Sequence, residues 1–132
     1  MANPNIVTVT SIYGESVGWN LAASTTTTLL TVASDVVIKI NFIQCANVDS
    51  VPATKSLDLY VDKSAFTSAG ATASSPATTT LYLAKGITVP GNAAIILLSS
   101  PLYLMETDVL KGGTAATGDL DLFISYEVIN DA

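Results

Sequence analysis

Apolar and polar residues alternate with a period of two over much of the chain. The clearest example is VVIKINFIQCANVD at 36–49, in which apolar side chains fall mostly at even positions and polar ones at odd positions. Side chains at alternate positions of a β-strand point to opposite faces, so this segment predicts a half-buried strand. Its even positions, on one face, are Val36, Ile38, Ile40, Phe42, Gln44, Ala46 and Val48.

The same pattern predicts strands elsewhere. Segments 56–62 (SLDLYVD) and 119–129 (DLDLFISYEVI) both alternate. The second segment is expected to place Leu120, Leu122, Ile124, Tyr126 and Val128 on one face. Weaker patterns predict shorter strands within 5–14, around Trp19, and within 25–33 and 102–110, with a turn at Tyr13-Gly14.

Four other segments differ from simple alternation. Segment 78–90 predicts a long strand or a bent pair, with Gly86 at the bend and with Leu81, Leu83, Ile87 and Val89 on one face. Segment 93–100 (AAIILLSS) is apolar on both faces, which is typical of a strand covered on both sides. Segment 111–118 (KGGTAATG) reads as a turn, and segment 64–77 as a long, exposed loop.

About eight or nine short strands, with turn signals every 8–12 residues and no helical period, favour an all-β fold. We expect an antiparallel β-sandwich, jelly-roll-like, of about eight strands, with a small closed β-barrel as the alternative. A chain of 132 residues corresponds to a single domain, 1–132, in which residues 1–6 can form an N-terminal arm.

The composition limits the kinds of partner that the chain is expected to bind. The chain has 11 Asp+Glu against 5 Lys+Arg and a net charge of -6, and its lysines are scattered, so neither nucleic acid nor an anionic membrane is expected as a partner. Its longest apolar run, 93–98, is too short to cross a bilayer. Only 12% of residues are charged, which suggests that copies of the chain or another protein cover much of its surface.

The sequence gives little support for a catalytic function. Histidine, the commonest general base, is absent, and so is a GxSxG nucleophile motif. We therefore expect no enzyme and no cofactor. Cys45 is the only cysteine and is expected to be a small, partly buried, inert thiol. The carboxylate pairs Asp119/Asp121 and Glu106/Asp108 could hold Ca²⁺, but the favoured interpretation is solvated strand faces, with no metal site.

Aromatic residues offer a second type of site. Tyr13 and Trp19 lie near each other around a glycine and could stack on a sugar, although such residues more often close a core or lie in a subunit interface. The residues predicted to contribute to an interface are Pro4, Ile6, Tyr13, Trp19, Phe66 and Phe123.

Several segments, in order, resemble small virion structural proteins of marine tailed phages, especially cyanophages. The matching segments are PNIVTVTSIYG (4–14), KINFIQCANVD (39–49), VP (89–90), LYLMETDVL (102–110) and LDLFISYEVI (120–129). Two departures are notable. Thr107 stands where the family pattern has glycine, so this corner is not expected to need a positive φ, and loop 64–77 is longer than the family suggests.

The resemblance implies a β-sandwich that coats or joins parts of a phage particle, without catalytic residues. The expected function is a capsid decoration (cement) protein, a homotrimer on the outer capsid surface that binds the major capsid protein or other virion proteins. Synthesis would occur in the host cytoplasm. The alternatives are a neck, tail or fibre component, and a carbohydrate-binding module that recognises a host surface.

Overall fold

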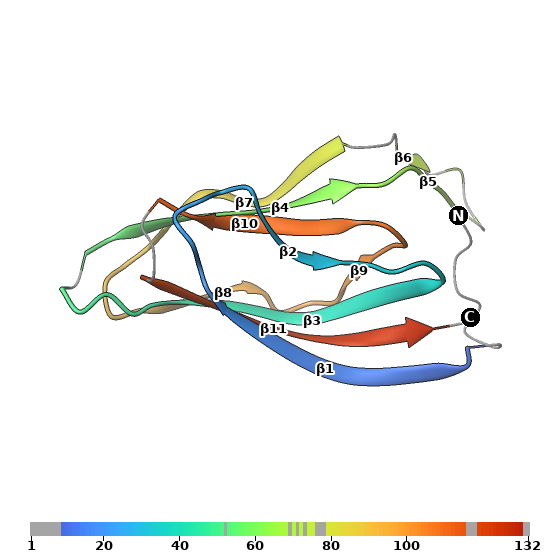
Figure 1. Cartoon of the computed structure of the whole chain (residues 1–132), viewed down its shortest axis with the longest axis horizontal. Coiled ribbons are helices and arrows are strands. Elements are labelled where there is room, and N and C mark those ends of the chain that lie inside the picture. Colours follow the sequence, from blue (N-terminus) through green and yellow to red (C-terminus); the bar gives the residue numbers. More distant parts are fainter. Residues whose placement is uncertain are drawn as a thin grey trace.

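The computed structural model describes residues 9–51, 53–68, 70, 72, 74–75, 79–115 and 119–130, which form two stacked antiparallel sheets without a helix (Figure 1). The all-β sandwich prediction is confirmed. The strands are β1 (Ser11–Asn20), β2 (Thr27–Thr31), β3 (Val36–Asn47), β4 (Lys55–Lys63), β5 (Phe66–Thr67), β6 (Ser74–Ser75), β7 (Thr79–Val89), β8 (Ala94–Leu98), β9 (Leu102–Leu104), β10 (Val109–Thr114) and β11 (Leu120–Asn130).

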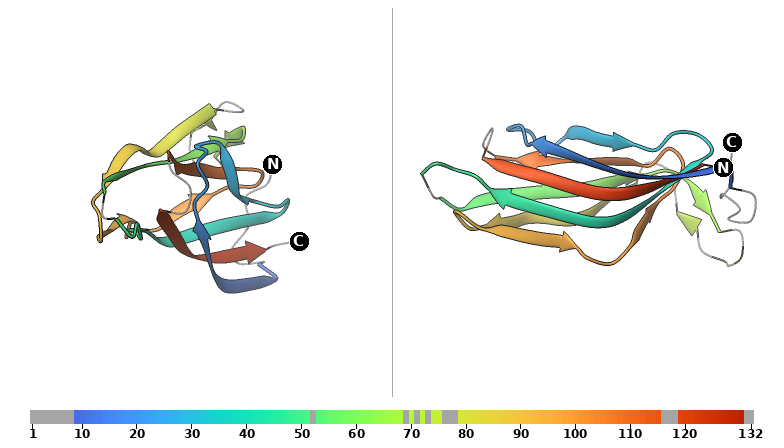
Figure 2. Two further views of the ribbon diagram at one scale, coloured as in Figure 1. Left: turned by 60° about the vertical axis from the view of Figure 1, so that its left-hand side comes forward. Right: turned by 90° about the horizontal axis from the view of Figure 1, so that it is seen from below.

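The strand order is that of a jelly roll. One sheet runs β1-β11-β3 and then β8 and β9, which pair with successive parts of β3, as the right view in Figure 2 shows. The other sheet runs β2-β10-β4-β7. If β8 and β9 count as one interrupted strand and the short β5–β6 pair is set aside, eight principal strands remain, four in each sheet, and every connection crosses between the sheets except that from β4 to β7, which pair in one sheet. The sheets do not close into a barrel.

Strand β3 has the predicted alternation only in its first half. Ile38 and Ile40 are buried, but beyond them the buried side chains are Ile43 and Cys45, at odd positions. The cause is a β-bulge: Ser125 of β11 pairs with Phe42 and Tyr126 with Ile40, which leaves Asn41 as an extra residue in β3. A single extra residue moves the following side chains to the other face, so the prediction that Phe42, Gln44, Ala46 and Val48 continue the face of Ile40 was wrong.

Strand β7 also departs from simple alternation. Its pairing with β4 shifts twice, between Leu57 and Leu59 and between Leu59 and Tyr60. Gly86 adopts a φ of 60° there and donates its N–H to Asp58 Oδ1 at 2.6 Å. Ala84 and Val89 are buried, whereas Leu81 and Leu83 are 48% and 40% exposed, so the predicted row of apolar positions is not uniformly buried.

Strand β8 is not covered on both sides by the part of the chain that the structure describes. Ile95, Leu97 and Leu98 pack against the core, whereas Ile96 is 61% exposed. The prediction of a strand buried on both faces was therefore wrong.

Three predicted turns or loops contain strand instead. Gly14 lies inside the continuous strand β1, and Gly112 and Gly113 lie inside β10. A side chain at Gly113 would collide with the carbonyl oxygen of Ser24, so glycine is needed for close backbone approach rather than for a turn. Within the segment 64–77, β5 pairs with β6 as a short antiparallel ladder.

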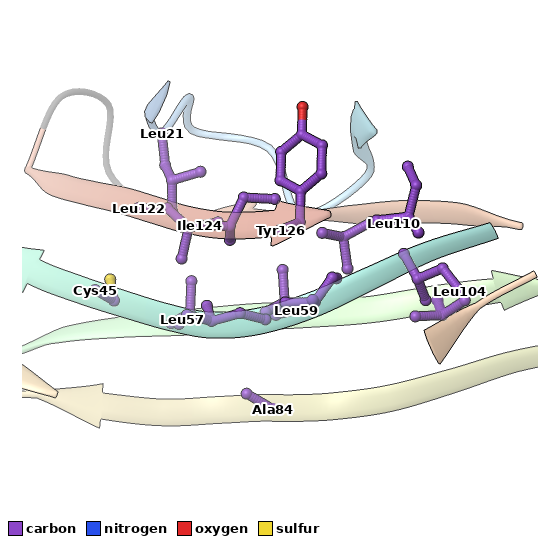
Figure 3. Close-up of a cluster of buried hydrophobic side chains, with 14 of the residues drawn as sticks. Leu21, Cys45, Leu57, Leu59, Ala84, Leu104, Leu110, Leu122, Ile124 and Tyr126 are labelled. Carbon is purple, nitrogen blue, oxygen red and sulfur yellow. The ribbon is translucent and has the colours of Figure 1, made fainter. Parts of the chain in front are cut away.

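The core lies between the two sheets. Side chains from β11, β4 and β10 meet there, and Figure 3 shows several of them. Even positions of β11 face inward up to Tyr126, as predicted, with Leu120 and Ile124 fully buried. The strand ends and loops form the two ends of the sandwich. The polar clusters described below lie at these ends.

Candidate functional site

Large apolar side chains are exposed on several parts of the described surface. Those at least 40% exposed are Ile12, Tyr13, Val48, Val51, Leu81, Tyr82, Leu83, Ile96, Tyr103 and Phe123. Single exposed apolar residues are normal, but clusters of them mark contact surfaces. Two clusters stand out, one at the β7/β9 side of the sandwich and one on the outer face of the β1-β11-β3-β8 sheet.

The first cluster surrounds an apolar cleft between the two sheets, where the edge strands β7 and β9 lie on opposite sides. Leu81 and Leu83 of β7 and Tyr103 of β9 line its mouth and are 48%, 40% and 54% exposed. The cleft has a volume of about 200 Å³. Val61, Leu102 and Leu104 form its apolar wall, and Lys63 and Asp108 supply polar atoms. We call these residues the β7/β9 cleft.

Aromatic side chains continue this surface on the outer face of the β4–β7 ladder. Tyr60 and Tyr82 are cross-strand partners with ring centroids 5.1 Å apart. The Lys85 ammonium lies 4.9 Å from the Tyr82 ring centroid, a cation–π contact. Tyr82 is thus an exposed ring held in place from two sides, which lowers the entropy lost when a partner covers it.

The second cluster is on the outer face of the other sheet. Phe123 of β11 is 46% exposed and pairs with Gly18 of the edge strand β1. The Phe123 ring lies 3.4 Å from the position that a Gly18 Cβ would occupy, so the ring covers the glycine across the ladder. Ile96 of β8 lies further across the same face, opposite Gln44 of β3.

The structure places four of the six predicted interface residues. Tyr13 is 57% exposed, Phe123 is 46% exposed, and Trp19 packs partly against the core. Phe66 is half-buried in β5, with the Lys63 ammonium 5.1 Å from its ring centroid. These residues do not converge on one surface. Pro4, Ile6 and the predicted arm 1–6 lie outside the described residues.

The sugar-stacking hypothesis loses its geometric basis. Tyr13 and Trp19 lie on one straight strand, six residues apart, rather than around a turn. Such a spacing separates them by roughly 20 Å, too far for both rings to stack on one sugar.

Asp108 forms a buried polar cluster, so the favoured interpretation that it lies with Glu106 on a solvated strand face was wrong for this residue. Its side chain is 0% exposed and forms an ion pair with Lys63 at 2.9 Å. Its carboxylate accepts the N–H of Ser64 at 2.9 Å and the N–H of Met105 at 2.8 Å, and the Ser64 hydroxyl lies 2.8 Å from Oδ1. Because all these partners are protein groups, the carboxylate joins the end of β4 to the β9–β10 turn.

Thr107, next to Asp108, has a φ of 66°. The expectation that this corner would avoid a positive φ was wrong. A β-branched residue is strained in this region, and the strain persists only where neighbouring contacts fix the turn. Thr107 donates its N–H to the Val32 carbonyl, and Asp108 accepts the Val32 N–H through its own carbonyl, so the turn is held from both sides.

The carboxylates considered for calcium bind protein groups instead. Asp119 pairs with Lys55 at 2.9 Å, and Asp121 accepts the Asn20 side-chain amide at 2.7 Å. Glu106 accepts the N–H of Asp35 at 2.9 Å. Among the residues that the structure describes, no group of three or more potential ligands is positioned to hold a metal ion.

The Cys45 thiol is fully buried, more deeply than predicted. Burial, assisted by the charge of Asp121, raises the pKa of this thiol to about 11. A thiol that stays protonated at neutral pH is a poor nucleophile.

The described part of the chain contains no helix of the length and apolarity that a membrane span requires.

Searches against protein-family models, characterised proteins and solved structures found no match for this chain. The candidate functional features are therefore those of the molecule itself: a jelly-roll fold, an apolar cleft between edge strands and exposed apolar side chains on both sheets.

Proposed function

We propose that this protein is a structural subunit of a phage virion, a decoration protein that stabilises the head by binding the outer face of the capsid. The observation that carries the proposal is the set of exposed apolar side chains around the β7/β9 cleft and on the β8 strand. The choice of a phage particle as the assembly rests on the resemblance of the sequence segments to small virion proteins.

The apolar surface supports a role in assembly. Ile96 belongs to a strand that is apolar on both faces yet is 61% exposed, and Leu81, Leu83 and Tyr103 frame an open cleft. Soluble monomers rarely gather such side chains, because water disfavours contiguous apolar area. A partner surface that covers them would gain roughly 25 cal/mol for each Å² of apolar area removed from water.

The rest of the surface is suited to the same role. Lysine and glutamate side chains lose about 0.5–1.5 kcal/mol of conformational entropy each when a contact immobilises them. A chain with only 12% charged residues avoids much of this cost. Jelly rolls also form many viral capsid and lectin domains, an analogy of fold that supports the proposal without carrying it.

The proposed partners are the major capsid protein or other virion proteins, and the proposed assembly is a homotrimer on the outer capsid surface. Each contact can be weak, because repeated sites on one shell add through avidity. Shells without the protein should then burst at a lower temperature or internal pressure.

The test is to purify particles from lysates in which this chain is produced and to measure its copy number by quantitative mass spectrometry, with antibody labelling in electron micrographs. Hundreds of copies on the head would support the decoration proposal. A few to tens of copies at a vertex or on the tail would assign the protein to the neck, tail or fibre. Absence from particles would overturn the proposal.

A matched pair of variants tests the surface. Leu83→Ser removes an apolar side chain from the mouth of the β7/β9 cleft, whereas Thr88→Ser alters an exposed position further along the same strand. We expect the first to reduce incorporation into particles at least several-fold and the second to leave it unchanged. Equal incorporation of both variants would exclude the cleft as the contact surface.

A further inference from the structure

The jelly roll has four edge strands, and three of them carry features that discourage pairing with another chain. Strand β2 is only five residues long. The β8–β9 edge is interrupted at 99–101, a stretch that ends with Pro101. Strand β7 has two register shifts and a left-handed Gly86. Short edges, prolines and bulges are the usual means by which proteins prevent edge-to-edge association.

Strand β1 has none of these features. It pairs with β11 over ten consecutive residues, Ser11 to Asn20, without a register shift. It contains no lysine and no proline, and Glu15 is its single charged residue. Among the described residues, no strand pairs with its other edge. A long, regular, nearly uncharged edge is a template for another strand.

The direction of the backbone groups follows from the ladder. The Leu21 N–H binds the Leu120 carbonyl at 2.8 Å, which identifies this position as a hydrogen-bonded pair. Because such pairs alternate along antiparallel strands, odd residues of β1 bond to β11 and even residues direct their N–H and C=O groups to the outer edge. Those outward groups belong to Ile12, Gly14, Ser16 and Gly18.

We propose that β1 pairs antiparallel with β1 of a second copy across a two-fold axis at Ser16, so that one continuous sheet crosses both subunits. This register places Gly14 opposite Gly18 and Tyr13 opposite Trp19 of the second copy. It uses the full length of the edge.

Side-chain complementarity selects this partner and this register. Tyr13 and Trp19 occupy non-hydrogen-bonded positions of the new ladder, where opposed side chains approach most closely, and aromatic cross-strand pairs are favourable. The two-fold axis generates this pair twice. Centring the pairing on Glu15 instead would oppose two carboxylates, which is unfavourable. The 57% exposure of Tyr13 in the single subunit is then relieved by the second copy.

The contact is independent of the proposed function. A trimer on a capsid would use other surfaces, and a protein that never enters a virion would still form this pair. Failure of one proposal therefore leaves the other intact.

Cysteine cross-linking tests the axis. In Ser16→Cys the two new thiols would lie opposite each other with Cα atoms about 5.5 Å apart, a separation that suits a disulfide. Ser125→Cys is the matched control, because Ser125 pairs with Ser16 on the adjacent strand of the same sheet. Its two copies would be three strand spacings apart, roughly 14 Å, which no disulfide spans. The native Cys45 is buried and does not interfere.

Under mild oxidation we expect Ser16→Cys to run as a covalent dimer on a non-reducing gel and Ser125→Cys to stay monomeric. A Ser16→Cys variant that stays monomeric, or equal cross-linking of both variants, overturns the proposal. Ser16→Lys provides a second test, because it opposes two ammonium groups at the axis. Sedimentation equilibrium should show at least a ten-fold weaker dimer than for the parent or for Thr28→Lys on β2. An unchanged dissociation constant contradicts the pairing.

Discussion

The two ends of the sandwich fix their loops by different means. At the end where β4 ends and β10 begins, on the right in Figure 1, the fully buried carboxylate of Asp108 binds Lys63, Ser64 and Met105. At the opposite end the buried polar group is neutral: the Asn47 amide donates to the carbonyls of Ala53 and Val89.

The charges of that second end lie closer to water. Lys55 bridges Asp49 and Asp119, and the three side chains are 19%, 16% and 24% exposed. A buried charge is stabilising only while every partner is present, whereas a hydrated ion pair contributes little. The comparison therefore predicts that the Asp108 end is sensitive to single changes and that the charges of the Lys55 end tolerate them.

The largest effect is expected from Asp108→Ala. It leaves the Lys63 ammonium without its counter-ion and two buried N–H groups without an acceptor, so we expect a loss of about 3–5 kcal/mol in the free energy of unfolding. Urea denaturation followed by fluorescence measures it. Asp121→Ala, at an exposed strand position, is the control and should change stability by less than about 1 kcal/mol. Similar losses in both variants would remove the distinction between buried and surface carboxylates.

Asn47→Ala should have the next largest effect. The amide is 4% exposed and also accepts the N–H of Asp49 at 3.1 Å. Its removal leaves the Ala53 and Val89 carbonyls without these donors, which costs roughly 1–3 kcal/mol. The same urea titration gives the value. If Asn47→Ala proves as costly as Asp108→Ala, a buried neutral group matters as much as a buried charge, and the contrast between the two ends fails.

Thr107→Gly should stabilise the Asp108 end. Glycine relieves the strain of a β-branched residue at a φ of 66°, and this gain exceeds the entropy that glycine adds to the unfolded chain, for a net increase of about 1 kcal/mol. Thr88→Gly, in an exposed position of β7, lacks that strain and should be destabilising. Thermal unfolding compares the two. A lower melting temperature for Thr107→Gly would show that the Val32 contacts make the threonine favourable in this turn.

The sequence allowed the sandwich and the even positions of β11 to be predicted, because a clean period of two identifies both a strand and its buried face. It did not allow the faces of β3 beyond Ile40 or the two register shifts of β7 to be predicted. A bulge such as that at Asn41 depends on the partner strand and leaves no mark in a local pattern.

The sequence allowed the general character of the surface to be predicted, but not the position of the cleft. Low charge led to the expectation of a covered surface, but the β7/β9 cleft forms where strands distant in sequence meet, and the alternation of β7 does not show that Leu81 lies at an exposed edge. Asp108 was interpreted as one of a solvated pair with Glu106, because sequence spacing does not show that Lys63 and Ser64 approach it from the end of the neighbouring strand β4.

The smallest effect is expected from the charges of the Lys55 end. A backbone hydrogen bond from Val51 and then the bond from Lys55 hold the pKa of Asp49 below its usual value. A carboxyl with a lowered pKa in the folded state contributes stability above its unfolded pKa, about 3.9, and loses it as the pH falls through the folded value. Lys55→Met should therefore lower the melting temperature slightly at pH 6.

That decrease should shrink in 1 M salt and fade as the pH is lowered from 6 through the lowered pKa of Asp49. Thermal scans of the parent and Lys55→Met across this range measure the difference. A large, salt-independent loss at pH 6 would mean that Lys55 stabilises its end through packing of its aliphatic stem rather than through its charge. The two ends would then differ in the chemistry of their buried groups but not in their sensitivity to substitution.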